Sequence, residues 1–145
     1  MRVVGIDLGE RRIGVAVSDS AGILASPRCT IERHDDEAAT WAAVVAVVEE
    51  VGARRVIVGL PLSLNGRRGP AARAAQADAE ELTRLLAPRG VTVETFDERL
   101  TTVSAARSLT AAGQRGRGQR TKIDQAAAAV LLQAWLDGPG SHRDA

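Results

Sequence analysis

Apolar and polar residues follow two different periods along this chain. Near the N-terminus they alternate in the manner of strands, and three strands are predicted, over residues 2–8, 13–18 and 23–31. Pro27 indicates that the third strand is an edge strand or carries a bulge. The period then becomes helical from Trp41 to Val51, and Gly52 suits the end of that helix. The first part of the chain therefore predicts a β-meander followed by a helix.

The second part of the chain alternates between strands and helices. Residues 55–60 form a continuous apolar run, which is typical of a central strand covered on both faces. A helix is predicted from Pro70, because proline fits the first helical position, and a fifth strand over residues 91–97. The rest of the chain is predicted as a helix, a mobile glycine- and arginine-rich loop and a last helix, over residues 102–112, 113–120 and 122–136.

Three strands followed by alternating helices and strands predict an α/β fold with a five-stranded mixed sheet. The first three strands would be antiparallel and the last two parallel, with helices on both faces. Right-handed crossovers place the fourth and fifth strands on the far side of the first, which becomes central. The carboxyl ends of strands one, four and five then face one crevice, where open α/β sheets bind ligands. We expect a single domain over residues 1–138 and a disordered tail over 139–145.

The composition fits a globular chain and excludes several other classes. The 145 residues are 45% hydrophobic and 26% charged, which excludes a disordered chain, a collagen and a coiled coil. The sequence predicts no transmembrane helix and no signal peptide. Cys29 is the single cysteine, so no internal disulfide is possible. A cytoplasmic protein with no membrane partner is expected.

The overall charge does not by itself indicate a nucleic-acid-binding protein. The formal net charge is only +1, and aromatic residues, on which unpaired bases stack, make up 2% of the chain. Positive charge is instead local, since residues 114–122 hold four cations and no acid. A nucleic acid would thus be recognised by its shape and backbone rather than by its bases.

Three acidic positions fall where the predicted elements begin or end. Asp7 interrupts the apolar first strand, the Asp97–Glu98 pair ends the fifth, and Asp124 begins the last helix. A buried carboxylate is costly unless it is paired or bound to a metal ion. Asp7 could instead meet an arginine or a turn hydrogen bond. Thr121 and Asp124 match a capping box, which would give Asp124 a purely structural role.

If these carboxylates meet at one crevice, they need a counter-charge. Oxygen ligands select hard cations such as Mg²⁺ or Mn²⁺, and two such ions about 3.5–4 Å apart can clamp the attacking and leaving oxygens of a phosphodiester. The two histidines, His34 and His142, lie in a predicted loop and in the tail, which does not favour a zinc site. No Walker A motif for nucleotide phosphates occurs.

Four motifs together resemble the YqgF (RuvX) family. They occur in the family's order, over residues 5–19, 58–66, 97–102 and 122–130. The resemblance implies a ribonuclease H-like fold, a relation to RuvC-type Holliday junction resolvases, and a nuclease role in maturing the 5′ end of pre-16S ribosomal RNA. It also places Asp7, the Asp97–Glu98 pair and Asp124 at the family's acidic positions.

The chain departs from the resolvase relatives at one point. Those relatives carry an acid near the end of the fourth strand, whereas residues 58–65 contain none. The fifth strand would therefore supply this acid. Strand alternation does not decide between Asp97 and Glu98. The longer reach of Glu98 favours it, with Asp97 as the alternative.

The leading hypothesis is a metal-dependent endonuclease that acts on structured RNA, with two Mg²⁺ or Mn²⁺ ions and water as the nucleophile. Asp7 would bridge the ions, and Glu98 and Asp124 would hold one each. Basic side chains would hold the phosphates of the nucleic acid. The candidates are Arg11, Arg12, Arg67, Arg68, Arg99, Arg115, Arg117, Arg120 and Lys122.

Three alternatives remain open. The chain could be a Holliday junction resolvase acting on branched DNA, or a catalytically weak assembly factor that binds ribosomal RNA. It could also be a nucleotide-binding domain, because Asp-Leu-Gly after a first strand occurs in the actin and sugar-kinase group, although those proteins need two such domains. A monomer or a homodimer is expected.

Overall fold

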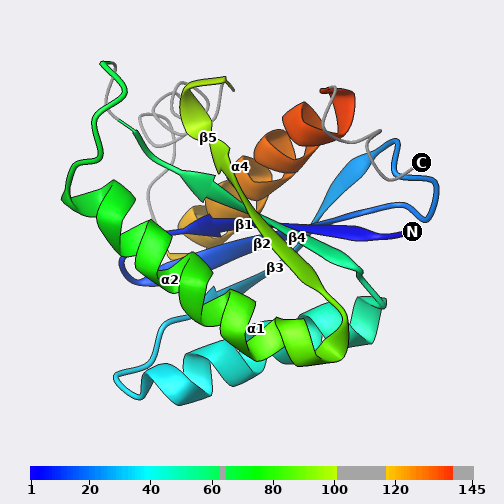
Figure 1. The fold of residues 1–145 in the computed structure, drawn as a ribbon, viewed down its shortest axis with the longest axis horizontal. Coiled ribbons are helices and arrows are strands. Elements are labelled where there is room, and N and C mark those ends of the chain that lie inside the picture. Colours follow the sequence, from blue (N-terminus) through cyan, green and yellow to red (C-terminus); the bar gives the residue numbers. More distant parts are fainter. Residues whose placement is uncertain (63–64, 101–116, 139–145) are drawn as a thin grey trace.

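A computed structural model describes residues 1–62, 65–100 and 117–138 of the chain, and its five strands form one mixed sheet (Figure 1). The strands are β1 (Val3–Leu8), β2 (Arg12–Ser18), β3 (Ala25–Glu32), β4 (Arg55–Leu60) and β5 (Thr92–Asp97). Their order in the sheet is β3-β2-β1-β4-β5. β2 is antiparallel to β1 and β3, whereas β4 is parallel to β1 and β5. The predicted strand pattern is confirmed, with β1 at the centre.

The turn between β1 and β2 and the path of β3 follow from local backbone chemistry. The N–H of Gly9 donates to the carbonyl oxygen of Arg12 at 2.9 Å, which closes the turn. In the β2–β3 pair the register shifts between Val15 and Ala16, and Ala16 pairs with Pro27. Proline has no N–H for a sheet ladder, so the predicted bulge on an edge strand falls beside Pro27.

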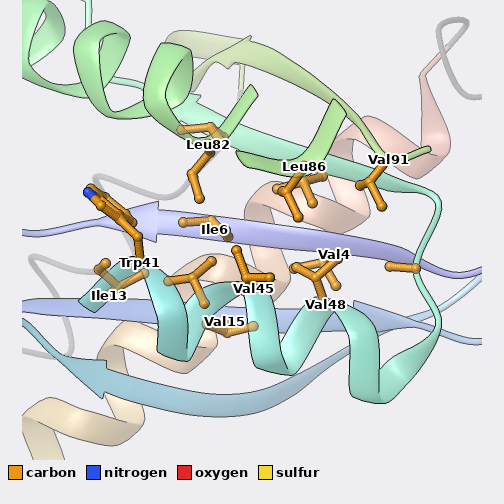
Figure 2. Packing of buried hydrophobic residues seen from close by; sticks show 14 of the residues in the cluster. Val4, Ile6, Ile13, Val15, Trp41, Val45, Val48, Leu82, Leu86 and Val91 are labelled. Atoms are coloured by element: carbon orange, nitrogen blue, oxygen red, sulfur yellow. The ribbon is translucent and has the colours of Figure 1, made fainter. Parts of the chain in front are cut away.

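Helices α1 (Glu37–Val51) and α2 (Pro70–Leu86) cover one face of the sheet (Figure 2). The carboxylate of Asp36 caps α1 by accepting the Ala38 N–H at 3.0 Å, and Gly52 ends it in the left-handed conformation with a φ of 68°. Short 3-10 turns, η1 (Ala87–Arg89) and η2 (Glu98–Leu100), flank β5. The helices and the sheet bury a continuous core between them, which includes Val4, Ile6, Ile13, Val15, Val48, Leu82 and Leu86.

Helix α4 (Arg117–Asp137) covers the opposite face of the sheet (Figure 1). A Cβ on Gly5 of β1 would lie 2.7 Å from the Cβ of Leu132, so the missing side chain lets this helix approach the central strand closely. Around this contact Ile57, Leu132 and Trp135 form a second apolar cluster. The prediction of helices on both faces is confirmed.

The start of α4 differs from the prediction. The glycine-rich sequence predicts a loop up to residue 120, but the helix begins at Arg117. Arginine and glutamine are good helix formers, and a single glycine costs a helix only about 1 kcal/mol. Thr121 and Asp124 therefore lie inside the helix, and the interpretation of Asp124 as part of an N-terminal capping box is wrong. The predicted helix over 102–112, the loop over 113–116 and the tail over 139–145 lie outside the described residues.

Helix α2 has the two-sided character of a surface helix. It buries Ala75, Ala79 and Leu82 against the sheet and exposes polar residues such as Arg73 and Arg84 to solvent. Within the described ranges, none of the helices combines the length and the apolar character that crossing a membrane requires.

Candidate active site

Asp7 lies at the carboxyl end of the central strand, between two glycines of the neighbouring strands. It is only 3% exposed. In the antiparallel β1–β2 pair Asp7 stands opposite Gly14. On the other side the parallel register pairs Ile6 with Val58, and continuing it by one residue brings Asp7 level with Gly59. Because neighbouring strands lie about 4.8 Å apart, Gly14, Asp7 and Gly59 form a short row across the sheet.

Glu98 occupies the space above Gly59 at one end of this row. A Cβ on Gly59 would lie 2.6 Å from Oε1 of Glu98, so the carboxylate lies where a β4 side chain would otherwise stand. Glu98 is 7% exposed. Its side chain therefore compensates for the acid that is missing from the end of the fourth strand. Of the two candidate acids after β5, Glu98 is the one that reaches the row of Asp7.

Asp97 is engaged elsewhere. Its carboxylate accepts the backbone N–H of Arg99 at 2.9 Å and the Arg99 guanidinium through Nε at 2.9 Å and Nη2 at 2.6 Å. These hydrogen bonds fix the 3-10 turn that follows the strand. The Arg99 guanidinium also holds the pKa of the Asp97 carboxyl below its ordinary value. Asp97 is thus an ionised structural partner of Arg99.

The backbone of Asp124 lies above Gly14 at the other end of the row, and its carboxylate is paired with an arginine of β2. A Cβ on Gly14 would lie only 2.0 Å from the backbone oxygen of Asp124, so α4 rests directly on β2 here. The Asp124 side chain accepts from Nε of Arg12 at 3.2 Å. Arg12 precedes Gly14 by two residues on β2, and residues two apart point to the same face of a strand.

The structure therefore brings the predicted acids to one edge of the sheet but gathers them only in part. Among the described residues, no three Asp, Glu, His or Cys side chains are close enough to hold one metal ion together. Asp7 and Glu98 belong to the same row, whereas the Asp124 carboxylate is paired with Arg12. The chemistry of the donor set, carboxylate oxygens at a buried sheet edge, fits a hard divalent cation.

The predicted phosphate-binding cations surround this edge unevenly. Arg67 and Arg68 are exposed in the loop between β4 and α2, in a turn where the Arg67 N–H donates to Oδ1 of Asn65 at 3.0 Å. A Cβ on Gly66 of this loop would lie 3.4 Å from Nη1 of Arg99, so the loop and Arg99 are neighbours. Arg11 is exposed in the β1–β2 turn. Arg115, and the side chains of Arg117, Arg120 and Lys122, lie outside the described residues.

A polar cavity of about 890 Å³ lies on the β2–β3 side of the edge. Arg12 lines it together with Arg11 and His34, and the acids Glu10 and Glu32 also contribute to the wall. Arg12 thus borders both the Asp124 carboxylate and an open space. The cavity carries both signs of charge, so it is not simply an anion-binding site.

Sequence reasoning missed Arg33, which holds the turn that follows Asp7. Its guanidinium donates to the Gly9 carbonyl at 3.0 Å and to Asp78 of α2 at 3.1 Å, and it stacks over the Trp41 ring at 5.3 Å. These partners are distant in sequence, so no local pattern could have found them. The roles of Gly14 and Gly59 were also missed. Glycine inside a strand does signal the close approach of another group, and that signal was available.

Comparison with known proteins gives a consistent result. A family model described as "RuvX: Holliday junction resolvase" matches residues 1–138. A protein of Mycobacterium sp. (strain KMS), named "Putative pre-16S rRNA nuclease", is 50% identical over 136 residues, which cover 94% of this chain and 79% of that protein. A protein of the same name from Rhodococcus opacus (strain B4) is 50% identical over 139 residues, covering 94% and 77%.

Solved structures match the fold. A structure of T. thermophilus RuvC in complex with Holliday junction substrate is 18% identical with a TM-score of 0.63, and the match covers 97% of both chains. A second Thermus thermophilus RuvC structure has a TM-score of 0.56 at 16% identity, covering 93% of this chain and 95% of that one. At such low identity these matches bear on the fold alone, and they confirm the ribonuclease H-like architecture.

Proposed function

The chain belongs to the RuvX family, and from that premise we propose that it is a metal-dependent endonuclease that matures the 5′ end of pre-16S ribosomal RNA. Family membership makes it a hydrolase of the nuclease class. The observation that carries the proposal is the row of Gly14, Asp7 and Gly59, which places the Asp7 carboxylate between Asp124 on one side and Glu98 on the other.

The residues that would hold divalent ions in this proposal are Asp7, Glu98 and Asp124. Buried carboxylates at the carboxyl ends of parallel strands are a suitable donor set for Mg²⁺ or Mn²⁺. When bound, these ions would supply charge neutralisation at the scissile phosphate and activation of a water molecule. The proposed ligands are all carboxylates, which is typical of an oxygen-only site for a hard cation.

The chain's own residues would position the substrate around this site. Arg67, Arg68 and Arg99 would bind phosphates on the β4–β5 side, and Arg11 on the β1–β2 side, because their guanidinium groups pair well with phosphate oxygens. Arg99 is preorganised for this by Asp97. The cations of residues 115–122 complete the proposed contact surface.

We favour ribosomal RNA over branched DNA as the substrate. Two relatives at 50% identity carry the pre-16S rRNA name, and they resemble this chain far more closely than RuvC does. The scarcity of aromatic side chains fits recognition of a folded RNA through its backbone. The second candidate, resolution of Holliday junctions, is favoured by the description of the family model. Action as a monomer or homodimer in the cytoplasm completes the proposal.

A cleavage assay with matched substrates tests this function. Purified protein is incubated with 5′-extended 16S precursor RNA, with the same RNA lacking the extension, and with a four-way DNA junction. Each reaction contains Mg²⁺, Mn²⁺ or EDTA. The proposal predicts metal-dependent cleavage of the extended RNA and no cut in the control RNA. Faster cleavage of the junction would favour the resolvase, and binding without any cleavage would favour the assembly factor.

A further inference from the structure

The ion pair between Arg12 and Asp124 has an unusual position among the ion pairs of the described residues. It joins a proposed metal ligand to a cation on the neighbouring strand, with Nε and Oδ2 3.2 Å apart. Both side chains are shielded, with 19% of Arg12 and 22% of Asp124 exposed. Because solvent screens such a pair only partly, the contact holds the Asp124 carboxylate in a defined direction.

In this arrangement the acids of the described residues do not form a three-carboxylate site. The Asp124 backbone lies directly above Gly14, the cross-strand partner of Asp7, so the helix already stands in the right place. Nevertheless, no three acids within the described part of the chain are close enough to hold one ion. The ion pair with Arg12 therefore engages a proposed ligand whose backbone is already beside Asp7.

Arg12 also borders open, polar space. It is one of the residues that line the cavity of about 890 Å³ beside β2 and β3. Glu10 and Glu32 line the same cavity, and Glu32 is the cross-strand neighbour of Arg12, so acidic groups near Arg12 offer alternative partners for its guanidinium group. Releasing Asp124 thus does not leave the Arg12 charge buried and unpaired.

We propose that Arg12 is a positioning residue that holds Asp124 in the metal-free protein and is displaced from its carboxylate when a divalent cation binds. The guanidinium and the cation compete for the same carboxylate. In the metal-free protein Arg12 supplies the counter-charge that the acids require. The inference rests on the proposed metal-dependent function and adds a step of regulation to its site.

Competition predicts a specific thermodynamic signature for Arg12→Gln. Without Arg12 the cation no longer displaces a bound partner, so Mn²⁺ should bind about three to ten times more tightly. The variant should melt below the wild type in EDTA, because a stabilising pair is removed. The difference in melting temperature between the two proteins should be smaller in saturating Mn²⁺, because the metal ion then supplies the positive partner of Asp124 in both.

Two control variants separate this signature from simpler effects. Arg11→Gln removes the same charge from the adjacent, exposed position and should change Mn²⁺ affinity less than twofold, which controls for long-range electrostatics. Arg55→Gln breaks the Arg55–Glu94 pair at the other end of β4, which has an N–O distance of 2.9 Å and exposed fractions of 20% and 36%. That variant should lose stability equally with and without Mn²⁺.

The experiment is calorimetric titration of Mn²⁺ into the metal-free full chain, with melting curves in EDTA and in Mn²⁺ for the four proteins. Tighter Mn²⁺ binding by Arg12→Gln alone supports the proposal. If the wild type binds Mn²⁺ and Arg12→Gln binds it equally or more weakly, Arg12 does not compete with the metal. That result would contradict the proposed role of Arg12 and leave the proposed metal site untouched. If the wild type shows neither heat nor a melting shift, the metal site falls as well, and with it the proposed metal-dependent function.

Discussion

Asp7 and Glu98 are buried acids on a sheet face that is otherwise covered by apolar side chains of α4. Burying a carboxylate costs free energy that a hydrogen bond or a counter-ion has to offset. Gly14 and Gly59, the neighbours of Asp7 across the sheet, carry no side chain and leave room for groups above them. At the scale of single residues the edge is therefore arranged for polar chemistry at some expense of core packing.

The neighbouring acids Asp97 and Glu98 should differ sharply when each is replaced by its amide. Glu98→Gln removes the proposed metal ligand above Gly59 and should lower the cleavage rate at least about a hundredfold. Asp97→Asn only weakens the hold on Arg99 and should slow cleavage less than about tenfold. Cleavage rates of the two variants under the same Mn²⁺ concentration decide this. Equal losses, or a larger loss for Asp97→Asn, would contradict the assignment of Glu98.

The Asp97 carboxylate should instead contribute to the pH dependence of the protein's stability. Arg99 lowers the pKa of its carboxyl below the ordinary value of 3.8 in the folded protein. A lowered folded-state pKa means that the stabilisation is present at neutral pH and is lost as the pH falls through that pKa. Asp97→Asn should melt at most a few degrees below the wild type at pH 7, because the pair is largely solvent-screened. This difference in melting temperature between Asp97→Asn and the wild type should disappear in melting curves recorded below about pH 4. A gap that is constant across this pH range would show that the carboxylate charge is not involved.

At the scale of elements, the contact between α4 and the sheet determines where Asp124 stands. The helix rests on glycines of β1 and β2, and at Gly14 of β2 its distance from the strand is set by backbone atoms of Asp124. A collision with backbone cannot be relieved by rotating a side chain. The glycine of β4, in contrast, faces the flexible end of Glu98. The two glycines beside Asp7 should therefore respond differently to the same added methyl group.

Gly14→Ala should destabilise the fold, whereas Gly59→Ala should mainly disturb the site. In the first variant the new Cβ would lie 2.0 Å from the Asp124 backbone oxygen, and such overpacking typically costs about 1–3 kcal/mol. In Gly59→Ala the Glu98 carboxylate can rotate away from the new methyl group. The cleavage rate should therefore fall clearly, while the melting temperature changes little. Gly69→Ala serves as a control, because nothing lies within 4 Å of its Cβ position. Chemical denaturation and cleavage rates for the three variants provide the comparison. Unchanged stability in Gly14→Ala would show that α4 is not held this close.

At the scale of the whole molecule, parallel strands place charge of both signs at one edge. Asp7 and Glu98 lie at the carboxyl ends of β1 and β5, and the exposed Arg67 and Arg68 follow β4. A net charge of only +1 means that nucleic acid is attracted by this local arrangement rather than by the protein's overall field. Binding should then depend on a few identifiable arginines.

Replacing Arg67 and Arg68 together by glutamine should weaken binding to nucleic acid and reduce its salt dependence. On duplex DNA, the slope of log affinity against log salt should shrink by about 0.9 for each phosphate that the protein no longer neutralises. Binding titrations at several salt concentrations measure this slope. Arg73→Gln, on the exposed side of α2, is a matched charge control and should leave the slope unchanged. A slope that does not change in the double variant would remove the β4–α2 loop from the contact surface.

The architecture and the acidic edge could be predicted because both follow local rules. Alternation and helical spacing identify the strands and helices, and strand direction then brings Asp7 and Glu98 to one edge. The longer reach of Glu98 favours it over Asp97 already in the sequence, but the space above Gly59 and the position of Arg99, which separate the two acids in the structure, could not be predicted. The pairing of Arg12 with Asp124 joins residues 112 positions apart in the chain. Local sequence patterns carry no information about such contacts.

The most direct test of the proposed nuclease site is the Mn²⁺ dependence of precursor RNA cleavage by the wild type and by Asp7→Asn. The wild type should cleave in Mn²⁺ and stop in EDTA. Asp7→Asn should be slower by at least about a hundredfold at every Mn²⁺ concentration, while binding the RNA within a few fold of the wild type and remaining folded by its melting curve. Wild-type cleavage rates in Asp7→Asn, or cleavage by the wild type that continues unchanged in EDTA, would contradict the assignment of this sheet edge as a metal-dependent nuclease site.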